Sequence, residues 1–108
     1  MPDDTHHYSM MFSTTSDRPE AERIAGLLVE QGLAACVQLM PIDSVYMWKG
    51  KIEKTGEILL LIKTRSDCVD KAMLTIKAAH SYEVPEIIAV PIEAGLPEYL
   101  AWISAGMS

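Results

Sequence analysis

The sequence predicts an α+β fold whose elements follow in the order β-α-β-β-α-β, with one further helix at the C-terminal end. Three observations predict it. Strand-like and helix-like segments alternate in that order, the two middle strands follow one another across a short turn, and each of the first two helices has one apolar stripe. We therefore expect a ferredoxin-like sandwich in which both of these helices cover one face of an antiparallel sheet.

The chain begins with a polar segment and continues into its first strand. Residues 1–7 are polar and predict a disordered N-terminal tail, followed by a single domain over residues 8–108. The stretch "YSMMFSTT", residues 8–15, is apolar and β-branched and ends in turn-forming residues. This pattern is typical of a central strand.

The next segment, residues 16–32, reads "SDRPEAERIAGLLVEQG" and has the signals of a helix. Asp17 is a suitable N-cap with Glu20 three positions later, and Pro19 is tolerated in the first turn. Gly32 stands where a left-handed C-cap is expected. The apolar residues at helical spacing, which predict one buried face, are Ala21, Ile24, Ala25 and Leu28.

Residues 33–64 predict a long β-hairpin. Its sequence is "LAACVQLMPIDSVYMWKGKIEKTGEILLLIKT", and Lys49 and Gly50 are the expected turn. Pro41 interrupts the first arm and has no N–H to donate, so that arm should bend or lie at an edge. Two strands of this length extend past their own core, so we expect Tyr46 and Trp48 to be covered by another subunit.

The second half of the chain predicts a helix, a strand and a helix. Residues 66–80 form the first helix, with Ser66 or Asp67 as its cap. Residues 86–94 form the strand, and Pro91 places at least its second half at an edge. The final helix covers residues 96–106. The expected packing residues are Val69, Ala72, Met73 and Ile76 in the earlier helix and Leu100 and Ile103 in the last one, where Trp102 is available to cover an edge or contact a neighbour.

Composition excludes several classes of partner. Apolar residues make up 49% and charged residues 22% of the 108 residues, which is typical of a globular domain. Nine basic and fifteen acidic side chains give a net charge of -6 without any basic stretch, so we expect no nucleic-acid partner. The longest apolar run, residues 58–62, is too short to cross a membrane, and the first residues lack the pattern of a secretory signal. We expect a cytoplasmic protein without membrane contact.

The sequence contains no common catalytic signature. Nucleophile elbows, glycine-rich phosphate loops and paired metalloprotease histidines are all missing, so we expect no enzymatic activity. Cys36 and Cys68 stand without a spacing typical of disulfides or zinc sites. Cys36 is expected to be a small buried hydrophobe. Cys68 lies in the first turn of a predicted helix, whose N-terminus could lower the pKa of the thiol, but we do not expect a reactive role.

The stretch "AHSYEVPE", residues 79–86, supports two interpretations. His80 at a helix C-terminus interacts favourably with the helix dipole, and Pro85 favours an extended backbone, so this stretch is a helix-to-strand corner. Alternatively, His80 could ligate copper or zinc together with Glu83, Glu86 or a cysteine from elsewhere.

The tip of the hairpin is a second candidate site. Its lysines around Trp48 could bind an anion or stack on a base, although Glu53 and Glu57 offset much of their charge. The alternative is a solvated tip whose aromatic residues pack against another subunit.

Several of these motifs, taken together and in order, resemble the CutA family of divalent-cation tolerance proteins. The resemblance runs from Tyr8 to Ile103. The motifs are "LAAC", Tyr46 and Trp48 before Gly50, Glu57, "IKT" ending at Thr64, the H-x-Y-x-x-P-E corner, and "YLAW". The resemblance implies a ferredoxin-like protomer in a PII-like homotrimer, a role in copper and divalent-ion tolerance, and no established enzymatic reaction.

The resemblance also implies which residues form the site. The bacterial copper-binding pattern has a cysteine where this chain has Ser13, and a pair of histidines where it has Ala79 and His80. His80 is thus the one metal ligand expected here, for a divalent metal such as copper. Ser81 replaces the usual proline. The resemblance further implies a groove between subunits that could hold a small anion or a metal, lined by Tyr46, Trp48, Lys63, His80, Tyr82 and Glu86.

Two functional hypotheses follow from the resemblance. In the first, a homotrimer acts in the response to metal ions and binds divalent cations weakly through His80 and nearby carboxylates. In the second, the trimer is a PII-like effector-binding or scaffold protein without metal chemistry.

Overall fold

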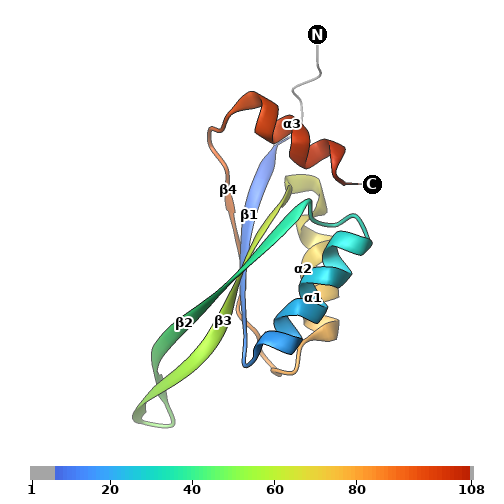
Figure 1. Cartoon of the computed structure of the whole chain (residues 1–108). Helices are drawn as coiled ribbons and strands as arrows, with labels where there is room; N and C mark the ends of the chain where they lie inside the picture. Colours follow the sequence, from blue (N-terminus) through green and yellow to red (C-terminus); the bar gives the residue numbers. More distant parts are fainter. Residues whose placement is uncertain (1–6, 108) are drawn as a thin grey trace.

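The computed structural model describes residues 7–107 and confirms the predicted order of elements (Figure 1). The predicted N-terminal tail lies outside the described residues except for His7, which is exposed. The elements are β1 (Tyr8–Thr15), α1 (Arg18–Glu30), β2 (Cys36–Trp48), β3 (Lys51–Arg65), a 3-10 turn (Ser66–Cys68), α2 (Val69–Ala79), β4 (Ile87–Pro91) and α3 (Pro97–Ala105). Within residues 7–107, no helix combines the length and the apolar content that crossing a membrane requires.

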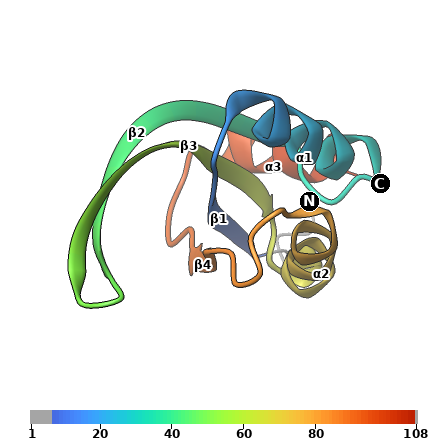
Figure 2. The same cartoon turned by 90° about the horizontal axis from the view of Figure 1, so that it is seen from below.

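The strands form one antiparallel sheet in the order β2-β3-β1-β4, so β1 is central as predicted. Helices α1 and α2 lie side by side against one face of the sheet, and α3 crosses its end away from the hairpin tip (Figures 1 and 2). β2 and β4 are the edge strands. Pro41 and Pro91 are therefore both on edge strands, where proline is tolerated because alternate backbone N–H groups point away from the sheet.

The core lies between the two helices and the sheet. From the sheet, Met11, Leu60 and Ile62 are buried completely. The helices contribute the stripes predicted from their spacing, and the fully buried members are Ala21, Ile24, Leu28, Ala72 and Ile76. A smaller cluster joins Tyr8, Ile103 and Met107 beneath α3. Each fully buried aliphatic side chain contributes about 1.5–3 kcal/mol, so these contacts fix the helices on the sheet.

The two helix starts differ from one another. Asp17 caps α1 as predicted, since its Oδ1 accepts a hydrogen bond of 2.9 Å from the N–H of Glu20. The predicted cap of the second helix is wrong. The Ser66 hydroxyl is instead bonded to Ser9 on β1 at 2.7 Å, and Asp67 pairs with Arg65 at 3.0 Å. With both side chains engaged elsewhere, the helix starts through a 3-10 turn and makes no side-chain cap bond.

The helix start does not lower the pKa of Cys68. Burial of the thiol and the neighbouring charge of Asp67 raise the pKa of Cys68 above its ordinary value. A thiol that holds its proton is a poor nucleophile and a poor metal ligand at neutral pH.

The hairpin extends well past the sheet, as its length predicted (Figure 2). β2 pairs with β3 along its entire length, but β1 pairs only with the part of β3 that begins at Ile58. Residues 42–57, which we call the distal hairpin, therefore pair only with each other among the described residues. Lys49 and Gly50 have positive φ values of 51° and 78°, as a type I′ turn requires.

The distal hairpin has two chemically different faces. Directly paired residues of antiparallel strands share a face, and positions two apart do as well. One face, which we call the aromatic face, presents Tyr46, Trp48, Glu53 and Glu57. The opposite face, which we call the apolar face, presents Val45, Met47 and Ile52, with exposed fractions of 62%, 65% and 68%.

Candidate functional site

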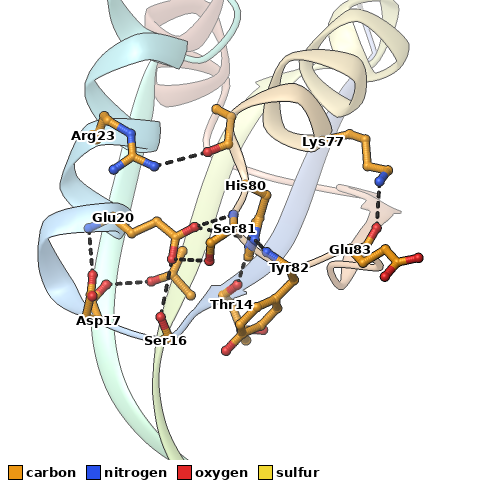
Figure 3. A network of polar contacts seen from close by, with 12 residues as sticks. Thr14, Ser16, Asp17, Glu20, Arg23, Lys77, His80, Ser81, Tyr82 and Glu83 are labelled. Carbon is orange, nitrogen blue, oxygen red and sulfur yellow. Dashed lines mark hydrogen bonds and ion pairs between the residues drawn. The ribbon is translucent and has the colours of Figure 1, made fainter.

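His80 caps the C-terminal end of α2 and is fixed by both ring nitrogens (Figure 3). Its Nε2 lies 2.7 Å from the backbone oxygen of Thr14, which can only accept, so Nε2 carries the proton. Its Nδ1 accepts a bond of 3.0 Å from the N–H of Tyr82. The side chain has no exposed surface. His80 is therefore the neutral Nε2–H tautomer, and it connects β1 to the corner.

Glu20 connects α1 to the same corner (Figure 3). Its carboxylate accepts bonds from the N–H of Ser81 at 2.7 Å, from the Ser81 hydroxyl at 3.0 Å and from the Ser16 hydroxyl at 3.4 Å. Burial alone would raise the pKa of Glu20, but the two bonds from Ser81 oppose it, and the pKa is lowered. Glu20 is thus a buried carboxylate that stays charged.

The residues of the corner do not form a complete metal centre. Over residues 7–107, no group of three or more His, Cys, Asp or Glu side chains could hold a metal ion. Ser13 has a buried hydroxyl without a hydrogen-bond partner among the described residues, at the position where the resemblance implies a cysteine. A hydroxyl is a poor ligand for a soft metal, and the His80 nitrogens are both engaged. High-affinity copper binding does not fit this arrangement.

A pocket of about 870 Å³ lies between the corner and the distal hairpin. The aromatic face of the hairpin forms one wall with Tyr46, Trp48, Glu53 and Glu57, and the corner forms the other wall with Tyr82, Glu83 and Val84. The His80 ring stands behind Tyr82, with 4.7 Å between the two ring centroids. Tyr82 thus connects His80 to the pocket, because it contacts the His80 ring and also lines the pocket.

The predicted groove lies between subunits, and the pocket of the single chain contains some of its residues. Tyr46, Trp48 and Tyr82 line the pocket, whereas Lys63, His80 and Glu86 do not. The Lys63 ammonium instead donates to Gln38 at 2.7 Å and lies 5.7 Å from the ring centroid of Tyr99. The groove prediction omitted the acidic and apolar wall residues Glu53, Glu57, Glu83 and Val84. The two hairpin glutamates could have been found from the alternation that places them on the face of Tyr46 and Trp48.

Tyr82 and Glu57 close the inner end of the pocket. The Tyr82 hydroxyl donates to Glu57 Oε2 at 2.8 Å, and the Ser44 hydroxyl donates to Glu57 Oε1 at 2.6 Å. Burial is the largest cause that raises the pKa of Tyr82, and the bond to the Glu57 carboxylate and its negative charge raise it further. The phenol therefore keeps its proton as a donor to Glu57.

This raised pKa predicts how the stability of the fold changes at alkaline pH. The folded chain holds the Tyr82 proton beyond the ordinary value of 10.0, so the resulting stability is present below that pH and is lost as the pH rises above it. Absorbance of tyrosinate, followed as the pH is raised, measures the ionisation of the tyrosines. In this titration, Tyr82→Phe should lack the component that appears at the highest pH. Tyr99→Phe, which removes one tyrosine elsewhere, should retain it. A late component that persists in Tyr82→Phe would contradict the assignment.

Comparison with known proteins gives one consistent family. Residues 9–106 match the family described as CutA1 divalent ion tolerance protein. The chain is 47% identical over 96 residues to Protein CutA of Mus musculus, covering 88% of this chain and 54% of that protein. It is 46% identical over 96 residues to the divalent-cation tolerance protein CutA of Archaeoglobus fulgidus, covering 89% of this chain and 94% of that protein. The chain thus spans about half the length of the mouse relative and nearly all of the archaeal one.

Solved structures agree with this relationship. The crystal structure of CutA from Xylella fastidiosa superimposes with a TM-score of 0.90 at 48% identity, covering 94% of this chain and 98% of that one. The structure of the A. fulgidus protein, described as periplasmic, gives a TM-score of 0.89 at 44% identity, covering 92% of this chain and 97% of that one. At these identities the ferredoxin-like arrangement and the long hairpin belong to both this chain and its relatives.

Proposed function

The chain belongs to the CutA1 divalent ion tolerance family, and from this membership we propose that it acts in the response to divalent cations as a non-enzymatic homotrimer that binds such ions weakly. Copper is the ion we propose to test first. The observation that supports weak binding is the position of the Glu20 carboxylate, 3.5 Å from His80 Nδ1. That nitrogen carries the lone pair of the neutral ring, so an ion there would have one imidazole and one carboxylate as ligands.

The same geometry explains why such binding would be weak. An ion at Nδ1 must displace the N–H of Tyr82 and enter a site whose His80 side chain has no exposed surface. Losing the hydrogen bond of a partly buried donor costs about 1–3 kcal/mol, which lowers the affinity by up to about two orders of magnitude.

Calorimetric titration of copper into the full chain tests the role of His80. Binding should be lost in His80→Ala and retained in a His6→Ala/His7→Ala control, which removes the other imidazoles of the chain. Restoring the family's pattern with Ser13→Cys and Ala79→His should strengthen binding at least about tenfold, because thiolate and imidazole suit copper better than a hydroxyl does. Equal heats from wild type and His80→Ala, together with no gain on restoration, would refute a metal role for His80.

Two features of the hairpin support a homotrimer. The β2 edge and residues 51–57 of β3 leave backbone hydrogen-bonding groups without a strand partner among the described residues. The apolar face adds three large side chains that are more than half exposed. A two-stranded ribbon with open edges and apolar side chains is marginally stable alone, so pairing with further copies would stabilise it.

We also propose a cytoplasmic location. Both cysteines are free thiols, and a cytoplasmic environment keeps thiols reduced. Since the A. fulgidus relative is described as periplasmic, fractionation of cells that express the full chain is the direct test.

The second candidate function is effector binding by the same trimer. The pocket supports it, because a concave site with aromatic walls and a few convergent polar groups is typical of small-molecule sites. If copper does not bind while a small organic molecule does, this function replaces the first.

A further inference from the structure

We propose that the pocket between the distal hairpin and the corner binds an aliphatic organic cation with two or more ammonium groups. This inference is independent of metal binding at His80, because it depends on other residues and another ligand class. It depends on three features of the pocket: its charge, its aromatic walls and its size.

The charged side chains that line the pocket, within residues 7–107, are all acidic. Glu53, Glu57 and Glu83 contribute carboxylates, and among the described residues no lysine, arginine or histidine lines the pocket. The Lys49 ammonium lies beside the ring of Trp48, which lines the pocket. Within residues 7–107, the carboxylates of Glu53 and Glu83 make no hydrogen bond or ion pair. Glu57 accepts one bond at each oxygen and retains further lone pairs. A multiply charged cation would therefore find complementary charges on both walls.

The aromatic walls favour an organic cation over a bare metal ion. The exposed fractions of Tyr46 and Trp48 are 44% and 58%, and ring faces attract ammonium groups. The chain already shows this attraction, since the Lys49 ammonium lies 5.6 Å from the ring centroid of Trp48. Aromatic rings supply no ligands to a divalent ion, whereas they cover the methylene groups of an aliphatic amine. Val84, 86% exposed, adds a further apolar contact.

The same features favour a cation in this pocket over a small anion. Lys63, a basic residue of the expected groove, does not line the pocket and donates to Gln38 instead. An anion in the pocket would be repelled by the three carboxylates that line it. The pocket volume of about 870 Å³ is within the range of about 300–1,000 Å³ that small-molecule sites occupy, so an extended amine fits.

Spermidine, an aliphatic triamine, is the probe for this proposal. In a Trp102→Phe background Trp48 is the only tryptophan of the chain, so its fluorescence reports on the pocket directly. Titration of the full-length variant at constant ionic strength should give a saturable change. Glu53→Gln should weaken the affinity about three- to tenfold, because it removes one charge from the wall without altering its shape.

The matched control is Glu30→Gln, which makes the same change of net charge on an exposed residue at the far end of α1. It should leave the affinity within about twofold of the parent, because screening removes most of its influence at that distance. A neutral diol of similar length should not saturate. The proposal is overturned if spermidine fails to saturate, as it would if a neighbouring copy fills the pocket. It is also overturned if both glutamine variants weaken binding equally, or if the diol or magnesium chloride gives the same response.

Discussion

Ile52→Glu is expected to convert a particle of about three chains into one of a single chain, with a mass of 11.9 kDa. Ile52 is 68% exposed and lies with Val45 and Met47 on the apolar face of the distal hairpin. A glutamate there remains hydrated in the separate protomer, so folding is little affected. In an assembly that buries this face, the carboxylate would lose its water without gaining a partner, at a cost of several kcal/mol for each copy.

The matched control is Leu74→Glu. Leu74 is 71% exposed on α2, away from the hairpin, so the same chemical change should leave the assembly intact. Multi-angle light scattering measures the mass, and circular dichroism verifies that each variant is folded. A wild-type mass near 11.9 kDa in dilute solution would refute the trimer itself. A trimeric Ile52→Glu would show that the apolar face is not its interface.

The fold was predictable because most of its signals are local. The cap at Asp17 and the two-residue turn at Lys49 and Gly50 each depend on residues within a few positions. The start of α2 was not predictable in this way. Ser66 looked like a cap in the sequence, but its hydroxyl bonds to Ser9, a contact between residues far apart in the chain.

The candidate site was only partly predictable. Strand alternation tells which face of the hairpin a residue is on, but it does not tell which part of that face lies against the corner. Lys63 shares the face of Glu57 on β3, yet the two are six positions apart, which is about 20 Å along a strand. The part of that face from Glu57 toward the tip lines the pocket together with the corner. Glu53 is therefore in the pocket and Lys63 is not, and this difference depends on how the long hairpin curves.

The buried carboxylate of Glu20 carries the second large effect. Glu20→Ala is expected to lower the free energy of unfolding by about 1–3 kcal/mol, because it leaves the N–H and hydroxyl of Ser81 without their acceptor. Glu22→Ala changes an exposed glutamate of the same helix and should have almost no effect. Urea denaturation at neutral pH measures both. A loss of equal size in the two variants would show that Glu20 acts only through helix propensity or net charge.

The pH dependence separates the charge of Glu20 from its shape. Because its pKa in the folded chain lies below the ordinary value of 4.5, the charged carboxylate stabilises the fold above that pH, and the contribution is lost as the pH falls through the folded pKa. Glu20→Gln keeps the shape without the charge, so the stability difference between wild type and this variant should shrink as the pH falls below 4.5. Assembly of several chains would add to the measured stability. Once Ile52→Glu is shown to be a monomer, the wild-type residue and glutamine at position 20 can be compared in that variant without this contribution. A difference that stays constant from neutral to acidic pH would mean that hydrogen bonding by the uncharged group, and not the ionised carboxylate, holds α1 to the corner.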